Sequence, residues 1–244
     1  LLVVGLAFLI VKVVRAESRT PVAYDVVLVS DQSPSMWDCD GIGTDPELLR
    51  ADAARLFITT LGADSSARYR LALLHFGGQV TPVAPLTDLA DETARQALLE
   101  AAGQPQPIRW TDHLLALQAA AQMLAETGES GSRRLIVLLT DGEPAPNPAT
   151  AAGRYNDAQY AQALQAKAEE LAQDDIALAV VLLSDTRTSC GRRVATEWAD
   201  RWARVAEATP GGALYMAGQA DDLLPIYHAI VRQLLGALEG DTAA

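Results

Sequence analysis

Short apolar runs that alternate with amphipathic stretches constrain the fold of this chain most. The runs at residues 24–30, 134–140 and 176–184 are rich in Val, Leu and Ile. Such runs are typical of strands that are buried on both faces of a parallel sheet. Because helical stretches separate them, right-handed crossovers should place helices on both faces of that sheet. The pattern predicts an α/β fold with a doubly wound, mostly parallel, Rossmann-like sheet of six strands.

Three further runs complete the predicted sheet. Residues 68–76 form a strand that ends in a Gly-Gly hairpin signal. The run that follows, residues 79–86, contains two prolines, so it is predicted to be the single antiparallel edge strand. A short last strand is expected at residues 213–216. Helices are expected at residues 45–61, 88–102, 112–127, 155–173, 194–209 and 221–238. We find no repeat and no internal linker, so residues 21–244 are predicted to form one domain.

The N-terminal segment has a different composition from the rest. Residues 1–14 are apolar apart from Lys12, whose long side chain can carry its charge to a membrane interface. A helix of this length spans roughly 21 Å, short of a hydrocarbon core of about 30 Å. Because the chain does not begin with Met, we expect the end of a longer single-pass membrane helix, with residues 1–16 in the bilayer and residues 1–20 as anchor and basic neck. A buried core helix is the alternative, and a cleaved signal peptide fits less well because the charged flank at residues 15–19 is still present.

The charge balance excludes one class of partner. The whole chain has a formal net charge of −12, and the 16 basic and 30 acidic residues of residues 21–244 make the predicted domain more acidic still. Such a surface repels the phosphates of a nucleic acid. The sequence also lacks a G-x-x-x-x-G-K-[ST] motif, so it does not bind nucleotide through a P-loop. Arg outnumbers Lys strongly and Ala is abundant, which favours a bacterial source with a GC-rich genome.

Three oxygen-rich stretches lie where the predicted strands end. The first strand leads into a D-x-S-x-S sequence, which contains Asp31, Ser33 and Ser35. Thr111 precedes a predicted helix, and Asp141 follows the strand at residues 134–140. In open α/β sheets, ligands bind at the carboxyl ends of the strands, so these side chains should lie at one edge. Hydroxyl and carboxylate oxygens are the ligands of hard divalent cations such as Mg²⁺.

This combination resembles the von Willebrand factor type A domain family, with its metal-ion-dependent adhesion site. The resemblance extends from residue 21 to about residue 238. It implies that the hydroxyls of Ser33, Ser35 and Thr111 hold Mg²⁺ together with Asp31 and Asp141, directly or through water. Ca²⁺ and Mn²⁺ are the alternative ions. The open coordination position then accepts an acidic side chain of a partner protein.

One residue departs from the family pattern. Pro34 stands between the two serines, where the family commonly has Gly. Proline fixes φ and removes a hydrogen-bond donor, but a φ near −65° suits the first turn of a helix. The departure puts the affinity for metal in question.

The loop after this motif is acidic and rich in glycine. Asp38 lies seven residues after Asp31, which is similar to the adjacent metal site of integrin β-subunit inserted domains, but the second acidic residue falls at Asp40. Ile42 and Leu49 stand where an EF-hand loop needs ligands. We therefore predict a surface loop and no second metal.

The two cysteines bear on the cellular compartment. Cys39 and Cys190 follow the first and fifth predicted strands, so both should lie at the metal end of the sheet. A disulfide between them would stabilise the fold by at most roughly 5 kcal/mol and would place the domain outside the cytoplasm. Two free thiols in a cytosolic protein are the alternative. The basic residues Lys12, Arg15 and Arg19 favour a cytoplasmic domain by the positive-inside rule, but that rule compares both flanks of a span, so we expect an extracytoplasmic domain.

No set of residues for nucleophilic catalysis is present. His75 and His228 are predicted to be packing or surface residues, and nothing pairs His113 with a nucleophile. G-x-S-x-G and S-x-x-K motifs are absent. We therefore predict a membrane-anchored, non-enzymatic module that binds a protein, itself membrane-associated, through metal. A scaffold subunit of a membrane complex, with a vestigial or purely stabilising metal site, is the alternative. A hydrolase that uses the metal to activate water is a weaker one.

Overall fold

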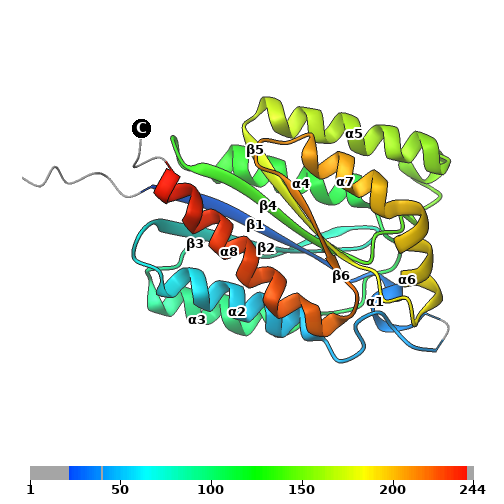
Figure 1. Cartoon of the computed structure of the whole chain (residues 1–244), viewed down its shortest axis with the longest axis horizontal. Coiled ribbons are helices and arrows are strands. Elements are labelled where there is room, and N and C mark those ends of the chain that lie inside the picture. The colour runs from blue at the N-terminus through cyan, green and yellow to red at the C-terminus, as the bar shows by residue number, and fades with distance from the viewer. Residues whose placement is uncertain (1–21, 40, 241–244) are drawn as a thin grey trace, which may run out of the picture.

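The computed structural model describes residues 22–39 and 41–240, and Figure 1 shows their arrangement. The predicted membrane anchor at residues 1–20 lies outside the described residues, as does Asp40. Within the described residues, we find no helix that combines the length and the apolar composition needed to cross a bilayer.

A six-stranded sheet in the order β3-β2-β1-β4-β5-β6 forms the centre of the domain. Only β3 is antiparallel, and it lies at an edge beside β2, as its two prolines require. The predicted α/β fold with one antiparallel edge strand is therefore confirmed. The strands are β1 (Ala23–Asp31), β2 (Arg68–Phe76), β3 (Val80–Asp88), β4 (Arg133–Thr140), β5 (Ile176–Leu183) and β6 (Ala213–Ala217).

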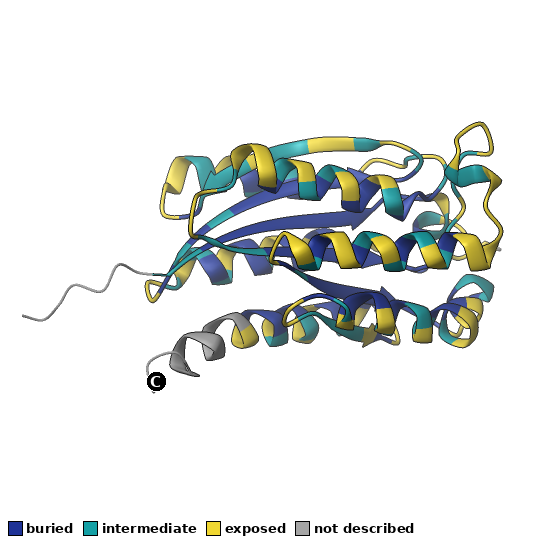
Figure 2. Ribbon diagram, turned by 90° about the horizontal axis from the view of Figure 1, so that it is seen from above, coloured by how far each residue is buried: buried dark blue, intermediate teal, exposed yellow. Residues whose placement is uncertain are grey.

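Helices cover both faces of the sheet. Along β1, Val26 and Leu28 pack on one side while Val27 and Val29 pack on the other, because successive side chains of a strand point to opposite faces. Figure 2 shows the buried strands between helices whose outer sides are exposed. The first face carries α2 (Leu49–Ala63), α3 (Glu92–Ala102) and α8 (Leu223–Gly240). The second face carries α4 (His113–Thr127), α5 (Asp157–Gln173) and α7 (Ala199–Glu207).

The helix predicted from residue 45 begins later, at Leu49. The side chain of Asp45 accepts hydrogen bonds from the backbone N–H groups of Leu49 at 2.8 Å and Arg50 at 3.1 Å, so it still caps the helix. Asp45 lies four residues before the start of the helix. Its carboxylate also binds the buried guanidinium of Arg50 at 2.7 Å, which holds it in that position. Leu48 completes the turn in the left-handed region, with φ 61°.

The remaining differences concern short helices near the carboxyl edge. The predicted helix at residues 194–209 is instead a π-helical turn (Val194–Trp198) followed by α7, and the short helix α6 (Ser189–Arg193) precedes the turn. α6 was not predicted, and the side chain of Thr188 caps it by accepting the N–H of Gly191 at 3.0 Å. The short elements are α1 (Pro34–Trp37), α6 (Ser189–Arg193) and the 3-10 turns η1 (Ala152–Arg154) and η3 (Ala220–Asp222).

Candidate metal centre

The candidate site lies at the carboxyl edge of the sheet, where β1 and β4 end side by side (Figure 1). Asp31 is the last residue of β1, and Asp141 follows the last residue of β4. α1 starts just after β1 and carries Ser35. Because the two strands are parallel neighbours, residues far apart in the sequence reach the same edge.

Both carboxylate oxygens of Asp31 accept hydrogen bonds in a fully buried position. Oδ1 accepts the backbone N–H of Ser33 at 2.7 Å, and Oδ2 accepts the hydroxyl of Thr140 at 2.6 Å. The hydroxyl of Ser33 in turn lies 3.2 Å from that of Ser35. The D-x-S-x-S residues therefore form one connected turn, with Asp31 and Ser33 buried and Ser35 half-buried.

Asp141 joins this turn from the other strand. It is 2% exposed, and its Oδ2 accepts the hydroxyl of Thr44 at 3.0 Å. Its carboxylate is also hydrogen-bonded to the side chain of Ser35 and lies close enough to Asp31 to be affected by its charge. The two predicted acidic ligands therefore share one site.

Thr111 completes the set. Its backbone forms an isolated antiparallel bridge to Ala145, with hydrogen bonds of 2.8 and 2.9 Å. Ser35, Thr111 and Asp141 line a hollow of about 330 Å³ at the protein surface. The structure thus brings all five predicted residues together, three on the hollow and two behind it.

The chemistry of this donor set fits a hard cation. Burial, and then the negative charge of Asp31, raise the pKa of Asp141 to about 7. Burial also raises the pKa of Asp31, although hydrogen bonds from Ser33 and Thr140 oppose this. A divalent cation would offset both desolvation and repulsion. In the described part of the chain no three His, Cys, Asp or Glu residues cluster as metal ligands, so a site here depends on hydroxyl oxygens.

Pro34 is accommodated without loss of a hydrogen bond. It occupies the first turn of α1, where a backbone N–H has no partner within the helix. Its carbonyl oxygen accepts the N–H of Asp38 at 2.8 Å. The backbone of the motif therefore tolerates proline at this position.

A buried arginine lies behind the site and was not predicted. Arg50 is 1% exposed, and besides Asp45 it donates to the side-chain oxygen of Gln32 at 3.1 and 3.3 Å. Its guanidinium also lies over the Trp37 ring, 4.5 Å from the centroid. Its positive charge lowers the pKa of Asp141. The available signal was an arginine at a core-facing position of the predicted helix.

His113 supports Asp31 through Thr140. Its Nε2 atom lies 2.8 Å from the Thr140 hydroxyl, which also accepts the N–H of Gly142 at 2.9 Å. Because that hydroxyl donates its proton to Asp31, the Nε2 of His113 must carry a proton and donate. Burial lowers the pKa of His113 to about 3, so the ring is neutral at physiological pH. The sequence analysis paired His113 with no nucleophile, and its contact with Thr140 was not predicted.

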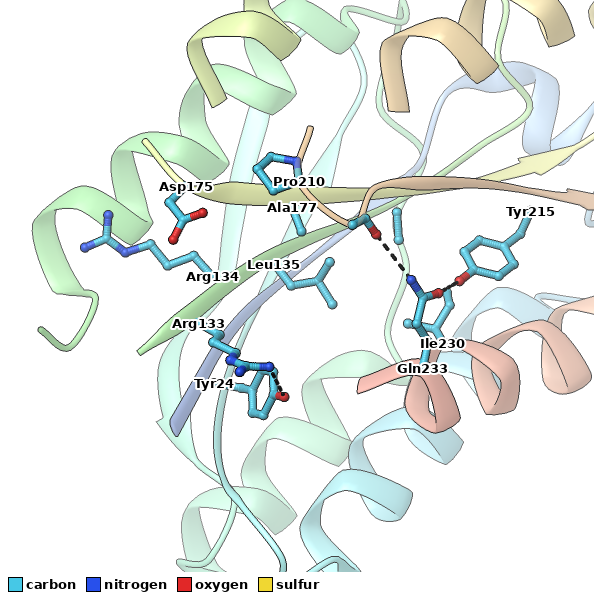
Figure 3. Close-up of a pocket in the computed structure, with 12 residues that line it drawn as sticks. Tyr24, Arg133, Arg134, Leu135, Asp175, Ala177, Pro210, Tyr215, Ile230 and Gln233 are labelled. Carbon is cyan, nitrogen blue, oxygen red and sulfur yellow. Dashed lines mark hydrogen bonds between the residues drawn. The ribbon is translucent and has the colours of Figure 1, made fainter. Parts of the chain in front are cut away.

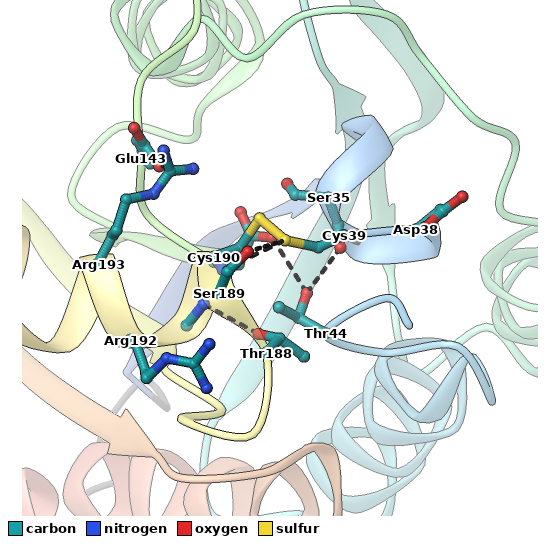
Figure 4. The surroundings of a disulfide bond; sticks show 12 residues. Ser35, Asp38, Cys39, Thr44, Glu143, Thr188, Ser189, Cys190, Arg192 and Arg193 are labelled. Atoms are coloured by element: carbon teal, nitrogen blue, oxygen red, sulfur yellow. Dashed lines mark hydrogen bonds and ion pairs between the residues drawn. A yellow bond between two sulfur atoms is a disulfide. The ribbon is translucent and has the colours of Figure 1, made fainter. Parts of the chain in front are cut away.

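A disulfide joins Cys39 to Cys190 beside the hollow (Figure 4). Of the two alternatives for the cysteines, the bridge is therefore confirmed, and it ties the loop after α1 to α6. Cys190 also lines the hollow. Nearby, Asp38 accepts the N–H of Gly41 at 2.7 Å and so caps its own loop. The prediction of no second metal stays a prediction.

A second hollow lies at the amino ends of β1, β4 and β5, opposite the candidate site (Figure 3). Its volume is about 280 Å³, and apolar residues such as Leu135 and Ile230 form part of its wall. Gln233 of α8 donates to the carbonyl oxygen of Gly211 at 3.2 Å and is hydrogen-bonded to Tyr215, which fixes the helix at this rim. None of the predicted ligands lines this hollow.

Comparison with known families decides the classification. The von Willebrand factor type A domain family matches residues 25–188, which include all five predicted ligands and end just before Cys190. The chain belongs to this family. No curated protein matches the sequence significantly.

Solved structures share the fold of this von Willebrand factor A domain at low sequence identity. The PilB minor pilin from Streptococcus sanguinis is 15% identical with a TM-score of 0.65, over 88% of this chain and 62% of that one. The pilus adhesin SpaC from Lactobacillus rhamnosus GG is 19% identical with a TM-score of 0.65, over 88% of this chain and 31% of that one. Proximal thread matrix protein 1 from the mussel byssus, with a zinc-occupied MIDAS motif, is 14% identical with a TM-score of 0.60, over 88% of this chain and 46% of that one. The chain thus spans less than two thirds of these proteins.

Proposed function

We propose that this von Willebrand factor A domain is a non-enzymatic module that binds a partner protein through a divalent cation. Mg²⁺ is the proposed ion, with Ca²⁺ and Mn²⁺ as alternatives. The observation that carries the proposal is the convergence of the five predicted ligands, named above, beside one open hollow.

The donor set suits recognition of a carboxylate. Ser33, Ser35 and Thr111 would contribute neutral hydroxyls, while Asp31 and Asp141 would contribute the negative charge. Because the hydroxyls add no charge, the cation would keep part of its positive charge and a coordination position that a partner carboxylate could fill. At 4 Å, a pair of unit charges attracts by about 4 kcal/mol at an effective dielectric constant near 20. The cation would therefore anchor an interface of modest size.

The proposed location is outside the cytoplasm, with residues 1–20 as a single-pass anchor and residues 1–16 in the bilayer. The disulfide between Cys39 and Cys190 supports this orientation, because such bonds persist in oxidising compartments and are rare in the cytosol. The partner would then be a membrane-associated or surface protein on the same side.

Metal binding and partner binding can be tested on the full chain in detergent. Titration calorimetry should show Mg²⁺ or Mn²⁺ binding to the wild type and no binding to Asp31→Ala or Thr111→Val. Asp52→Ala is the matched control, because that side chain is 63% exposed on α2, away from the site. Cation binding that survives in both site variants would contradict the proposal.

A pull-down from detergent-solubilised membranes, with and without EDTA, identifies the partner and tests its dependence on metal. The proposal expects partners that are lost in EDTA and in Asp31→Ala. Co-purification with a large assembly that is insensitive to both would instead support the scaffold alternative, in which the site is vestigial or only stabilises the fold.

A further inference from the structure

The loop that carries Thr111 holds a strained aromatic residue at the rim of the hollow. Trp110 has φ 68°, a left-handed conformation that bulky residues rarely adopt. Such a conformation is energetically unfavourable and persists only where the surroundings enforce it. Strain of this kind is concentrated at functional sites, and Trp110 lines the same hollow as Ser35, Thr111 and Asp141.

Backbone hydrogen bonds of the two residues before Trp110 hold the loop in place. The N–H of Ile108 donates to the carbonyl oxygen of Gln32 at 2.7 Å, and the carbonyl oxygen of Arg109 accepts the N–H of Gly78 at 2.6 Å. A Cβ atom at Gly78 would lie 2.7 Å from the Cβ of Trp110, so only glycine lets the β2–β3 hairpin approach this closely. The loop is therefore fixed against the same turn that carries the predicted ligands.

Arg109 is a positively charged residue of this loop that can contact a ligand in the hollow. Its side chain is exposed, lies over the Trp110 ring at 4.9 Å from the centroid, and lines the hollow. The ion pairs of the described residues do not include Arg109. Arg193, the other arginine on the hollow, is already paired with Glu143 at 2.7 Å (Figure 4). An anion that enters the hollow would therefore find Arg109 uncompensated.

Local charge decides what binds here, although the domain as a whole is acidic. The Debye length at physiological ionic strength is about 8 Å, so distant carboxylates of residues 21–244 are largely screened. Within the hollow, the proposed cation and Arg109 both favour anions. A guanidinium can also hold a carboxylate with two parallel hydrogen bonds, and stacking on an indole orients its plane beforehand.

We propose that Arg109, positioned on Trp110, binds a second carboxylate of the partner. The recognised segment is then an acidic peptide that carries two carboxylates close together, one for the cation and one for Arg109. This inference rests on the proposed function, which assigns the first carboxylate to the metal. Trp110 acts as a positioning residue, because it orients the guanidinium rather than contacting the cation.

Synthetic peptides of Gly and Ser test the inference on the full chain in detergent with Mg²⁺. One peptide carries a single Asp, and the others carry two Asp residues that are adjacent or up to three residues apart. By titration calorimetry, the best two-Asp peptide should bind the wild type about tenfold more tightly than the one-Asp peptide, the gain expected for one charge-assisted contact. Arg109→Gln should remove this difference without changing the affinity for the one-Asp peptide, and Arg109→Lys should retain part of it.

The control variant is Arg55→Gln, because Arg55 is an exposed arginine on α2 whose loss should leave both affinities unchanged. Equal affinity of the wild type for all peptides overturns the inference but leaves the proposed function intact. An equal loss of affinity for both kinds of peptide in Arg109→Gln also overturns it, because that result indicates general attraction. Cation binding without binding of any peptide overturns the inference, and failure to bind the cation at all overturns the proposed function as well.

Discussion

A hydrogen bond of 2.6 Å runs from the hydroxyl of Thr140 to Oδ2 of Asp31, and both residues are fully buried. It joins the ends of β4 and β1 and orients the first predicted ligand. Thr140 also lies 2.8 Å from Nε2 of His113, so three elements fix the direction of one carboxylate. Groups that orient a ligand in this way commonly affect metal affinity without touching the metal.

Thr140→Val should therefore weaken cation binding. Valine keeps the shape of threonine but removes the donor to Asp31, and the loss of such a supporting contact typically lowers metal affinity about 10- to 100-fold. Titration calorimetry with Mn²⁺ measures the effect. Thr59→Val on the exposed side of α2 is the control and should bind as the wild type does. Unchanged affinity in Thr140→Val would show that Asp31 is held without this bond.

Arg50→Met should destabilise the domain strongly. Arg50 and Asp45 form an ion pair of 2.7 Å in which the side chains are 1% and 0% exposed. Removing one partner leaves a buried charge uncompensated, so the free energy of unfolding should fall by about 3–5 kcal/mol. Urea denaturation measures it.

Two comparisons separate this effect from a loss of packing. Adding Asp45→Asn to Arg50→Met should recover part of the stability, because no buried charge is then left alone. Arg55→Met removes an exposed ion pair with Asp52 and an exposed hydrogen bond to the carbonyl oxygen of Leu99, and should change stability by less than about 1 kcal/mol. If Arg50→Met and Arg55→Met have similar effects, the buried pair is not important for stability.

His75 should make the domain less stable in mild acid. Burial and then the charge of Arg50 lower the pKa of His75 to about 4, from its ordinary value of 6.5. Between these values the unfolded chain binds a proton that the folded chain does not. Stability is therefore full above pH 6.5 and falls as the pH drops toward 4, by up to about 3 kcal/mol.

The measurement compares denaturation curves of the wild type and His75→Gln from pH 7 to 4 in EDTA. Asp141 has a raised pKa and so contributes stability of the opposite sign, but this contribution is common to both proteins. The wild type should therefore lose more stability than His75→Gln as the pH falls. His228→Gln, on the exposed side of α8, should follow the wild type. Parallel curves for wild type and His75→Gln would show that His75 takes up its proton equally in both states.

Trp110→Gly should be more stable than Trp110→Ala. Both variants lose the indole, so the loss of packing cancels, and only glycine adopts a φ of 68° without strain. We expect a difference of about 1 kcal/mol in the free energy of unfolding, measured with urea. Both should bind the two-Asp peptide less tightly than the wild type does. Equal stability of the two variants would indicate that the loop relaxes once the ring is removed.

Breaking the disulfide should destabilise the domain. The bond closes a loop with a sequence separation of 151 residues. Loss of a native disulfide typically costs about 2–5 kcal/mol. Urea denaturation of the wild type with and without reductant should show this loss, whereas the double variant Cys39→Ser with Cys190→Ser should be unaffected by reductant. A wild type that is equally stable in reductant would show that packing alone holds α6 against the loop after α1.

The sheet was predictable because its strands are locally encoded. The apolar runs that became β1, β4 and β5 are too continuous for a solvent-exposed strand, and the prolines of β3 exclude it from the interior. Helix boundaries were less predictable. The start of α2 depends on Arg50, which attracts the carboxylate of Asp45 from within the folded core.

The predicted ligands were found because a short motif and two strand ends carry them. The residues that support these ligands were not predicted. Thr44, Thr140 and Arg50 act through contacts between segments that are distant in the sequence. The hydroxyl of Thr44 donates to Asp141 at 3.0 Å although 97 residues separate the two, and no local pattern predicts such a pairing. The predictions of bound metal and of a membrane anchor remain predictions.

The sequence by itself determined the layered α/β fold, the edge strand and the candidate ligands, since these depend on local periodicity, proline chemistry and motif spacing. Only the tertiary structure decided that the cysteines pair, that Arg50 is buried, and that Arg109 forms no ion pair with another described residue. The physical reason is that such properties depend on which charges and sulfur atoms meet after folding. Packing on the two faces of the sheet determines which of these groups meet, and local sequence patterns do not predict it.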